Sequence, residues 1–361
     1  MIGKLMHLVF KVIFFALFIT LSIESKAAVV LQYHHVDDNT PYATSISPSI
    51  FIQHMQYLAD NNFRVLPLPQ LIELLKNGES LNDKNIAITF DDGYKSVYRS
   101  ALPVLQKHGF PFTIFINPSL VDGNLFMSWD ELRESTKHGG IIANHTVSHP
   151  HLVRYLDGES HQQWKERIKY EIAEAEKIIR KQIGHSPKLL AYPYGEFNND
   201  SKSIAENLNL VAFAQHSGAF DENVDWQAVP RFAFGGQYVG MDSFVDKVNS
   251  LPMQLEEVIV FDENGQRLDE ALLPMNSTKP KLTLKLKSIA TAQQIQCYAS
   301  SIGRIDIKVN SNTVTTQLKD NLPIGRSRIN CTAPSQQRGR FYWYSQLFLR
   351  KKEDGSWYQE H

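Results

Sequence analysis

The sequence has few cysteines, no excess of either charge and, beyond its first residues, no long hydrophobic run. Two of its 361 residues are cysteines, and 37 Lys and Arg stand against 38 Asp and Glu. A net charge of −1 provides no basic surface for a polyanion, so we expect no nucleic-acid partner. With 43% hydrophobic and 21% charged residues and no repeat, the composition excludes a disordered chain or a coiled coil and is typical of a globular protein.

The longest apolar stretch lies at the N-terminus. Lys4 and Lys11 precede an apolar run from Val12 to Ile23. After this run, Ser25 and Ala27 supply small residues at the −3 and −1 positions of a signal-peptide cleavage site. The run is shorter than the ~20 residues that a membrane-spanning helix needs. We therefore interpret residues 1–27 as a cleaved signal peptide, which predicts a periplasmic, extracellular or cell-surface protein with no stable membrane span after cleavage.

The two cysteines, Cys297 and Cys331, both fall in the last quarter of the chain. An oxidising compartment outside the cytoplasm allows them to pair, so we predict one structural disulfide between them. Closing a loop of this length contributes ~3–4 kcal/mol in the chain-entropy model, which suits a small C-terminal module.

The order of apolar and amphipathic segments predicts an α/β fold followed by a β-rich module. From residue 29 to about 250, short apolar runs alternate with stretches of helical period, which is typical of β-α units around a parallel sheet or barrel. After about residue 252 the runs alternate apolar and polar residues, which is typical of an antiparallel β-sandwich-like module. We expect a catalytic domain over 28–252 and a C-terminal module over 253–361, with the boundary inside 251–280.

The expected elements are as follows. Strands are predicted at 29–33, 86–90, 112–116, 141–143, 189–192, 211–214 and 229–234, and the longest helix at 160–183. In the module, strands are predicted at 281–286, 295–299, 304–309, 313–318 and 341–349.

Two adjacent carboxylates, Asp91 and Asp92, directly follow the apolar run Ile86–Phe90. Such a strand end faces the functional side of an α/β barrel. Consecutive strand residues point to opposite faces, so both carboxylates can serve one site only if the strand breaks, which Gly93 permits. The alternative is an ordinary surface turn, because Asp-Asp-Gly is common turn material.

Two histidines four residues apart, His145 and His149, follow another apolar run. Neutral imidazole is the commonest metal ligand, and two imidazoles with a carboxylate form a three-ligand site with open positions for water. His151 lies next to them, so spacing alone does not decide which two of the three bind, and a solvated polar loop is the alternative. A third apolar run ends in the segment Tyr192–Gly195, which contains a Pro-Tyr turn. This turn can direct a backbone N–H and an aromatic ring toward the same end of the barrel as the carboxylates and histidines.

These three motifs, in this order, resemble the polysaccharide deacetylase family, carbohydrate esterases that remove N-acetyl groups from chitin, peptidoglycan and poly-N-acetylglucosamine. Residues Thr89–Gly93 and His145–Pro150 match the family motifs in type, order and separation. The resemblance covers about residues 29–250 and implies a distorted (β/α) barrel.

The resemblance also implies a role for each motif residue. Asp91 corresponds to the general base, and Asp92, His145 and His149 to the ligands of a divalent metal, most often Zn²⁺, with Ni²⁺ or Co²⁺ as alternatives. Asp91 would accept the proton of a water whose pKa the metal lowers. The backbone N–H of Tyr194, which follows Pro193, would stabilise the oxyanion.

The chain departs from the family pattern at two places. The arginine before the Pro-Tyr turn is absent, and no C-terminal Leu-x-His element supplies the general acid. Tyr33-His34 resembles an element of the subgroup that deacetylates poly-β-1,6-N-acetylglucosamine, so His34 is the candidate acid, with His35 or His216 as alternatives. Arg231 is the candidate for orienting Asp91 in place of the missing arginine.

Aromatic residues complete the candidate site. Trp226 resembles a family tryptophan that lines the acetyl pocket. Trp129 fits a core position better than a sugar platform. In the expected strand at 341–349, Tyr342 and Tyr344 share one face while Phe341 and Trp343 share the other, so one face is expected in the core and the other is a candidate glycan surface.

Together these features predict an exported, metal-dependent hydrolase that removes N-acetyl groups from N-acetylglucosamine units of a polysaccharide or oligosaccharide. The Tyr-His element favours poly-β-1,6-N-acetylglucosamine over chitin fragments or peptidoglycan. The alternatives are an O-acetyl esterase of the xylan type and a non-catalytic glycan-binding envelope protein. The sequence does not define the oligomeric state.

Overall fold

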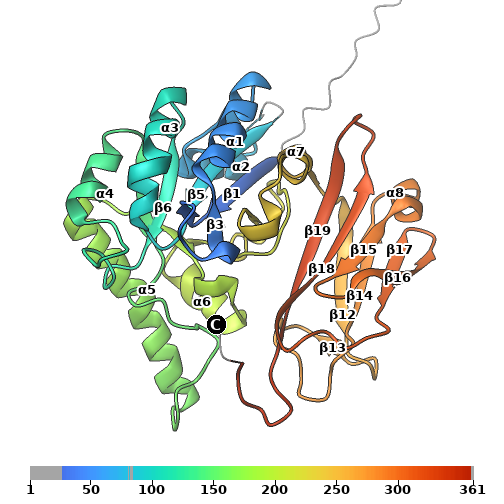
Figure 1. Cartoon of the computed structure of the whole chain (residues 1–361). Helices are drawn as coiled ribbons and strands as arrows, with labels where there is room; N and C mark the ends of the chain where they lie inside the picture. Colours follow the sequence, from blue (N-terminus) through green and yellow to red (C-terminus); the bar gives the residue numbers. More distant parts are fainter. Residues whose placement is uncertain (1–26, 80, 82–83, 359–361) are drawn as a thin grey trace, which may run out of the picture.

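The computed structural model describes residues 27–79, 81 and 84–358, which form two curled sheets packed side by side (Figure 1). The predicted signal peptide lies outside the described residues except for its last residue, Ala27. Within the described part of the chain, no helix is both long and apolar enough to cross a membrane.

The first sheet is parallel throughout, with strand order β10-β1-β5-β6-β7-β8-β9 and β4 paired with β5. Its strands are β1 (Ala28–Tyr33), β4 (Arg64–Val65), β5 (Asn85–Phe90), β6 (Phe112–Ile116), β7 (Gly140–Asn144), β8 (Leu189–Ala191), β9 (Val211–Phe213) and β10 (Phe232–Ala233). All seven predicted strand positions are occupied, although the last is reduced to the short β10.

The segment between β9 and β10 links the two ends of this sheet. The Val229 N–H donates to Ala212 O in β9 at 2.9 Å, and the Phe234 N–H donates to Gln32 O in β1 at 2.9 Å. One buried cluster takes residues from β1, β5, β6, β7, β8 and β9 and fills the inside of the curl; it includes Val30, Ala87, Phe115, Ala143, Ala191 and Phe213. The predicted distorted α/β barrel is therefore confirmed.

Helices surround the curl (Figure 1), and most of them bury its outer face, whereas α2 (Leu68–Lys76) packs against the inner cluster. They are α1 (Pro48–Asp60), α2 (Leu68–Lys76), a π-helical turn (Val97–Ala101) leading into α3 (Leu102–His108), α4 (Trp129–Thr136), α5 (His161–Ile183), α6 (Asn199–Asn207) and α7 (Met241–Val248). Short 3₁₀ turns occupy Tyr42–Thr44, Pro193–Gly195 and Gly236–Tyr238, and β2 (His35–Val36) pairs with β3 (Ser45–Ile46). Helix α5, the predicted long helix, begins after the capping residue Ser160 and ends at Gly184.

The second sheet has the order β11-β19-β18-β15-β16-β17-β14-β12-β13 and is antiparallel apart from the pair β11–β19. Its strands are β11 (Leu251–Pro252), β12 (Leu255–Phe261), β13 (Arg267–Leu268), β14 (Lys281–Leu286), β15 (Gln296–Ala299), β16 (Gly303–Asn310), β17 (Thr313–Gln317), β18 (Gly325–Pro334) and β19 (Phe341–Arg350), with the short helix α8 (Ile289–Gln294) before β15. The five predicted strands are present.

Strands β12 and β18 were not predicted. The inward positions of β18 are Ser327, Ile329, Cys331 and Ala333, which are small or only moderately apolar, so the alternation is weak in the sequence. In β12, two glutamates interrupt the apolar pattern near its start. The predicted disulfide joins Cys297 in β15 to Cys331, its direct partner in β18, and both sulfur-bearing side chains are buried in the core of this sheet.

Strands β18 and β19 carry the contact between the two sheets. The Trp343 ring meets Phe232 of β10 edge-on, with 5.0 Å between centroids. Leu347 and Leu349 pack with Val153 of the first unit. Tyr342 and Tyr344 pack against the core of the second sheet. Both faces of the predicted aromatic strand therefore take part in packing, while Phe341 is exposed and Trp343 and Tyr344 also line a groove between the two sheets.

Candidate active site

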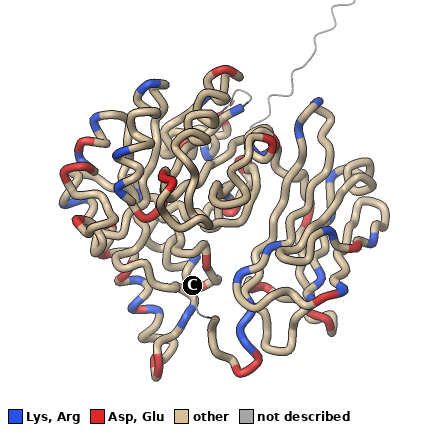
Figure 2. The backbone as a smooth tube through the Cα atoms, viewed as in Figure 1, with Lys and Arg blue, Asp and Glu red and all other residues tan. Residues whose placement is uncertain are grey.

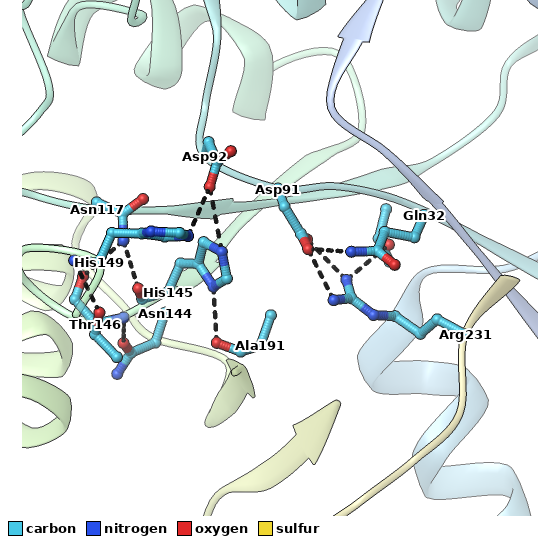
Figure 3. Close-up of polar contacts among 11 residues, drawn as sticks. Gln32, Asp91, Asp92, Asn117, Asn144, His145, Thr146, His149, Ala191 and Arg231 are labelled. Carbon is cyan, nitrogen blue, oxygen red and sulfur yellow. Dashed lines mark hydrogen bonds and ion pairs between the residues drawn. The ribbon is translucent and has the colours of Figure 1, made fainter. Parts of the chain in front are cut away.

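Asp91 is fixed in a buried ion pair at the C-terminal end of β5. Arg231 donates two nearly parallel hydrogen bonds to its carboxylate, Nη1 to Oδ1 at 2.7 Å and Nη2 to Oδ2 at 2.8 Å (Figure 3). Gln32 Nε2 donates to Oδ2 at 2.6 Å, and Arg231 Nε donates to Ala214 O at 3.0 Å. Asp91 and Arg231 are both 0% exposed. The structure thus brings together the pair that the sequence suggested.

The surroundings of Asp91 keep it ionised. Burial raises the pKa of Asp91, but the Arg231 guanidinium and His145 lower it by more, so the net pKa lies below the ordinary value. Each carboxylate oxygen has two acceptor directions, and Oδ1 uses one of them for Arg231. Asp91 is therefore held as an anion that can still accept a proton.

The strand breaks immediately after Asp91, as one shared site requires. Asp92 has a φ of 69° and Gly93 a φ of 71°, both in the left-handed region. As a result, Asp91 points toward Arg231 while Asp92 points toward the two histidines (Figure 3). A Cβ on Gly93 would lie 2.9 Å from Ile116 Cγ2, so a larger residue would have to displace the Ile116 side chain. The Asp-Asp-Gly motif is therefore part of a buried strand end and not a surface turn.

Asp92, His145 and His149 converge on one point. Asp92 Oδ1 lies 3.2 Å from His145 Nε2 and 3.3 Å from His149 Nε2, and the three ligand atoms all lie within 4.8 Å of one another. His151, the third histidine of the loop, instead places Nδ1 2.8 Å from Glu196 Oε2. The ambiguity left by sequence spacing is resolved in favour of His145 and His149.

The donor set fits a divalent cation. His145 Nδ1 lies 2.7 Å from Ala191 O, so Nδ1 carries the proton and the lone pair of Nε2 faces Asp92 Oδ1. Asp92 Oδ1 is buried and has no hydrogen-bond donor in the described structure. Two acceptors that face each other in a buried site require a positive charge between them. Two imidazole nitrogens and one carboxylate oxygen are the ligands of a catalytic zinc site.

The pKa shifts agree with this reading. Burial lowers the pKa of His149 to about 4, so this imidazole is neutral and its lone pair is available. Burial lowers the pKa of His145, but Asp92 and Asp91 raise it by more. The two carboxylates therefore favour a positive charge next to His145. A proton or a metal ion can supply that charge.

Strained backbone is concentrated around the same residues. Asp92, Thr146, His149 and Tyr194 have φ values of 69°, 68°, 59° and 59°, all in the left-handed region although none is glycine. Such conformations cost about 1–2 kcal/mol each and persist where the surrounding structure imposes them. Asn144 and Asn117 brace the loop: Asn144 Oδ1 accepts from the Thr146 N–H at 2.7 Å, and Asn117 Nδ2 donates to His145 O.

The Pro-Tyr turn lies beside the histidine loop. The Tyr194 ring stacks on His151, with 3.8 Å between centroids, and meets His149 at 4.5 Å. Pro193 is buried at the start of the turn. A Cβ on Gly195 would lie 2.5 Å from Gln215 Cβ, so this position has no room for a side chain. The turn is therefore rigidly placed against the predicted metal ligands.

The three candidate acids occupy different environments. Burial raises the pKa of Asp92, but the neighbouring His145 and the charge of His34 lower it by more, so His34 lies within electrostatic reach of the site. His35 is buried and stacks on Tyr94 at 3.6 Å, and burial lowers its pKa to about 4. His216 borders a groove of about 650 Å³ between the two sheets, and none of Asp91, Asp92, His145 and His149 lines that groove. Of the three, His34 is the one whose charge acts on both Asp91 and Asp92, and it is partly exposed.

The structure does not bring Trp226 to the site. Its ring packs near Phe220 and under Lys76 Nζ, 5.0 Å away, and Phe220 pairs with Ala28 at the beginning of β1. Asp91 and Asp92 follow the opposite, C-terminal ends of these strands. The predicted role in an acetyl pocket is therefore not retained, because the Asp-Trp element lies on the return path from β9 to β10. Trp129 packs partly buried against the main core, as expected.

Three site residues were not predicted. Tyr94 stacks on His35, and its pKa is raised by burial and by the charge of Asp92. Gln32 holds Asp91, and Glu196 accepts from His151. Gln32 does leave a signal in the sequence, because its amide interrupts the otherwise hydrophobic run Ala28–Tyr33.

Comparison with known proteins identifies the first unit. Residues 78–213 match the family model of polysaccharide deacetylase. A putative polysaccharide deacetylase, YxkH of Bacillus subtilis, is 28% identical over 177 residues, which cover 49% of this chain and 60% of that protein. The poly-β-1,6-N-acetyl-D-glucosamine N-deacetylase of Escherichia coli K12 is 22% identical over 285 residues, which cover 67% of this chain and 42% of that protein.

The fold agrees with solved structures. The Streptococcus pyogenes deacetylase PplD in complex with acetate superposes with a TM-score of 0.56 at 20% identity, covering 62% of this chain and 98% of that one. The resemblance inferred from the motifs is thus confirmed: residues 78–213 belong to a polysaccharide deacetylase domain. The chain spans 60% and 42% of the lengths of the two relatives named above.

Proposed function

We propose that this protein is an exported, metal-dependent N-deacetylase that acts on N-acetylglucosamine units of a polysaccharide. The observation that carries the proposal is the pair of carboxylates at one strand end. Asp91 is held as an anion by Arg231, while Asp92 faces His145 and His149. A protein that only binds glycans needs neither a fixed base nor a metal-ligand set, so the arrangement favours catalysis.

The side chains divide the reaction between them. A divalent metal held by Asp92, His145 and His149, which we propose to be Zn²⁺, would supply Lewis acidity toward the acetamide carbonyl and lower the pKa of a water molecule. Asp91 removes the proton from the attacking water, and Arg231 keeps its carboxylate aimed.

The other two roles complete the proposal. The backbone N–H of Tyr194 donates to the developing oxyanion, and its rigid turn provides the preorganisation that such a donor needs. His34 protonates the leaving amine, because of the three candidates it lies within electrostatic reach of both carboxylates and is partly exposed.

For the substrate, we propose poly-β-1,6-N-acetylglucosamine. The Tyr33-His34 element supports this choice, and so does the name of the Escherichia coli relative, which covers 67% of the chain. We also propose that residues 1–27 are removed on export, that 28–252 form the catalytic domain and that 253–361 form a separate C-terminal module.

The decisive experiment measures acetate release by residues 28–361 from N-acetylglucosamine oligomers with β-1,4 or β-1,6 linkages. Release should stop with a chelator, return with Zn²⁺ and be fastest on the β-1,6 oligomers. The Asp91→Asn variant provides the matched control, because it removes the base and leaves the three metal ligands intact. Acetate release from acetylated xylan alone would favour the O-acetyl esterase, and no release from a metal-loaded protein would favour the non-catalytic binder.

A further inference from the structure

Glu196 lies two residues after Tyr194 and is buried. Its carboxylate accepts hydrogen bonds from side chains of the first unit and of the C-terminal module. It is 0% exposed. Its Oε2 accepts from His151 Nδ1 at 2.8 Å, and its Oε1 accepts from Tyr358 OH at 2.6 Å and from Arg154 Nη2 at 3.4 Å. Arg326 Nη1 lies 3.7 Å from Oε1.

Two of these partners come from the C-terminal part of the chain. Arg326 lies at the beginning of β18, and Tyr358 follows β19 near the end of the described residues. Figure 1 shows this last segment running back from β19 toward α6 of the first unit. The β-rich module therefore reaches the loop that carries Tyr194 and adds to Glu196 one hydrogen bond, from Tyr358, and one ion pair, with Arg326.

The last described residues, Trp357 and Tyr358, are themselves anchored. Arg154 Nη1 donates to Tyr358 O at 3.0 Å, and the Arg154 guanidinium lies over the rings of Trp357 and Tyr358, at 5.0 and 4.6 Å from their centroids. Cation–π contacts and a hydrogen bond to the main chain fix the position of the Tyr358 hydroxyl. Tyr358 is thus a specific donor to Glu196.

The same network continues toward the metal ligands. His151, held by Glu196, stacks on the Tyr194 ring, and that ring meets His149. The Arg326 guanidinium lies 5.3 Å from the centroid of the Tyr194 ring. Because Tyr194 is held at a φ of 59°, its turn depends on the surrounding contacts to keep the conformation.

Glu196 is charged in this network. Burial raises its pKa, but the hydrogen bonds from His151 and Tyr358 and the charges of His151 and Arg154 lower it by more. A buried carboxylate that loses one donor must find another partner or move, and the backbone next to it belongs to the Pro-Tyr turn.

We propose that the C-terminal module is part of the active site: Arg326 and Tyr358 are positioning residues that fix Glu196, and through it hold the Tyr194 turn in the geometry that stabilises the transition state. The inference rests on the proposed function for its kinetic consequence. Its structural half, the coupling of the chain end to the turn, is independent of the substrate.

The test compares Tyr358→Phe and Arg326→Gln with the matched control Arg340→Ala. Arg340 also joins the two units, through Nε to Asn249 O at 2.8 Å, but at a place away from the turn. We expect kcat on N-acetylglucosamine oligomers to fall about 10-fold or more in the two test variants with KM changed less than about twofold, because a displaced turn fails only in the transition state. Arg326→Lys should recover part of the loss.

Hydrogen exchange supplies a readout that needs no turnover. The peptide covering residues 190–198 should exchange faster in Tyr358→Phe than in the parent protein, and Arg340→Ala should leave it unchanged. Equal kinetics and equal exchange in the test and control variants would overturn the inference, as would a loss confined to KM. If the parent protein releases no acetate, the proposed function fails, and the exchange of this peptide alone decides the coupling.

Discussion

Removing Arg231 is the most direct way to test how the site keeps its base ionised. Arg231 and Asp91 are both 0% exposed and joined by two hydrogen bonds of 2.7 and 2.8 Å. Truncating one partner of such a buried pair leaves an uncompensated charge and costs about 3–5 kcal/mol. Since a domain is typically stable by about 5–15 kcal/mol, Arg231→Ala should consume a large part of the stability.

The pH dependence of this loss has a definite sign. Arg231 depresses the pKa of Asp91 in the folded state, so the pair stabilises the fold above the unfolded pKa of about 3.9, and the stabilisation disappears as pH falls through the folded pKa. Without Arg231, burial raises the pKa of Asp91. The stability deficit of Arg231→Ala should therefore be complete at neutral pH and should narrow in acid.

Activity gives a second, independent readout, for which Arg231→Lys is the better variant. Lysine keeps the charge but cannot donate two parallel hydrogen bonds to one carboxylate. The protein should therefore still fold, with its free energy of unfolding lowered by only about 1–3 kcal/mol. The acid limb of kcat/KM should move to higher pH, because Asp91 must be ionised to act as a base.

Urea denaturation at pH 4 to 8 and kcat/KM profiles over the same range test both statements. Arg133→Ala is the control, since Arg133 forms an exposed pair with Asp130 and should change neither curve measurably. A stability deficit independent of pH, together with an unmoved acid limb in Arg231→Lys, would refute the assignment of Asp91 as an ionised base held by Arg231.

Three further predictions concern the remaining groups. Asp91→Asn should remove nearly all turnover and keep bound metal, whereas His149→Ala should lose the metal as well. Metal analysis after dialysis distinguishes the two variants. Equal metal loss in both would contradict the assignment of Asp91 as base and Asp92 as metal ligand. His34→Ala should lower kcat by ~10²-fold with the metal retained, and an unchanged kcat would move the acid role to another group. Replacing Cys297 and Cys331 by Ala should cost ~3–4 kcal/mol in urea denaturation of the oxidised protein, for a sequence separation of 34, and no change would mean that the bridge is not formed in solution.

The fold of the first unit was predictable because its strands are continuous apolar runs. Strands buried on both faces, such as β5 and β6, leave a strong signal whatever their surroundings. The second sheet was less predictable, because β18 places Ser327 and Ala333 inward and its outer face, with Arg326, meets the first unit. Its pairing depends on tertiary contacts that no local pattern encodes.

Site residues could be predicted where polar side chains directly follow a strand. They could not be predicted where backbone conformation or long-range packing determines the position of the side chain. The Asp91-Asp92 pair and the loop that carries His145 and His149 could be selected by residue type and spacing, whereas the choice of these two histidines over His151 came from the family resemblance. The left-handed backbone of Asp92, which turns its carboxylate toward the histidines, had only Gly93 as its signal. Trp226 shows the converse: its dipeptide resembles a site element, yet the return path of the chain carries it to the other end of the strands.

Closure of the curl explains how this chain can lack the usual arginine and still hold its base. The missing arginine would precede the Pro-Tyr turn on β8, whereas Arg231 precedes β10. In the sheet order, β1 lies next to β5 and β10 lies next to β1, whereas β8 lies on the other side of β5. The segment before β10 also hydrogen-bonds to β9 at the other edge of the sheet, which closes the curl. Side chains from both edges of the sheet therefore meet inside it, and Arg231 reaches Asp91 from the side of β1. An arginine can therefore change strands while its charge stays on the same carboxylate.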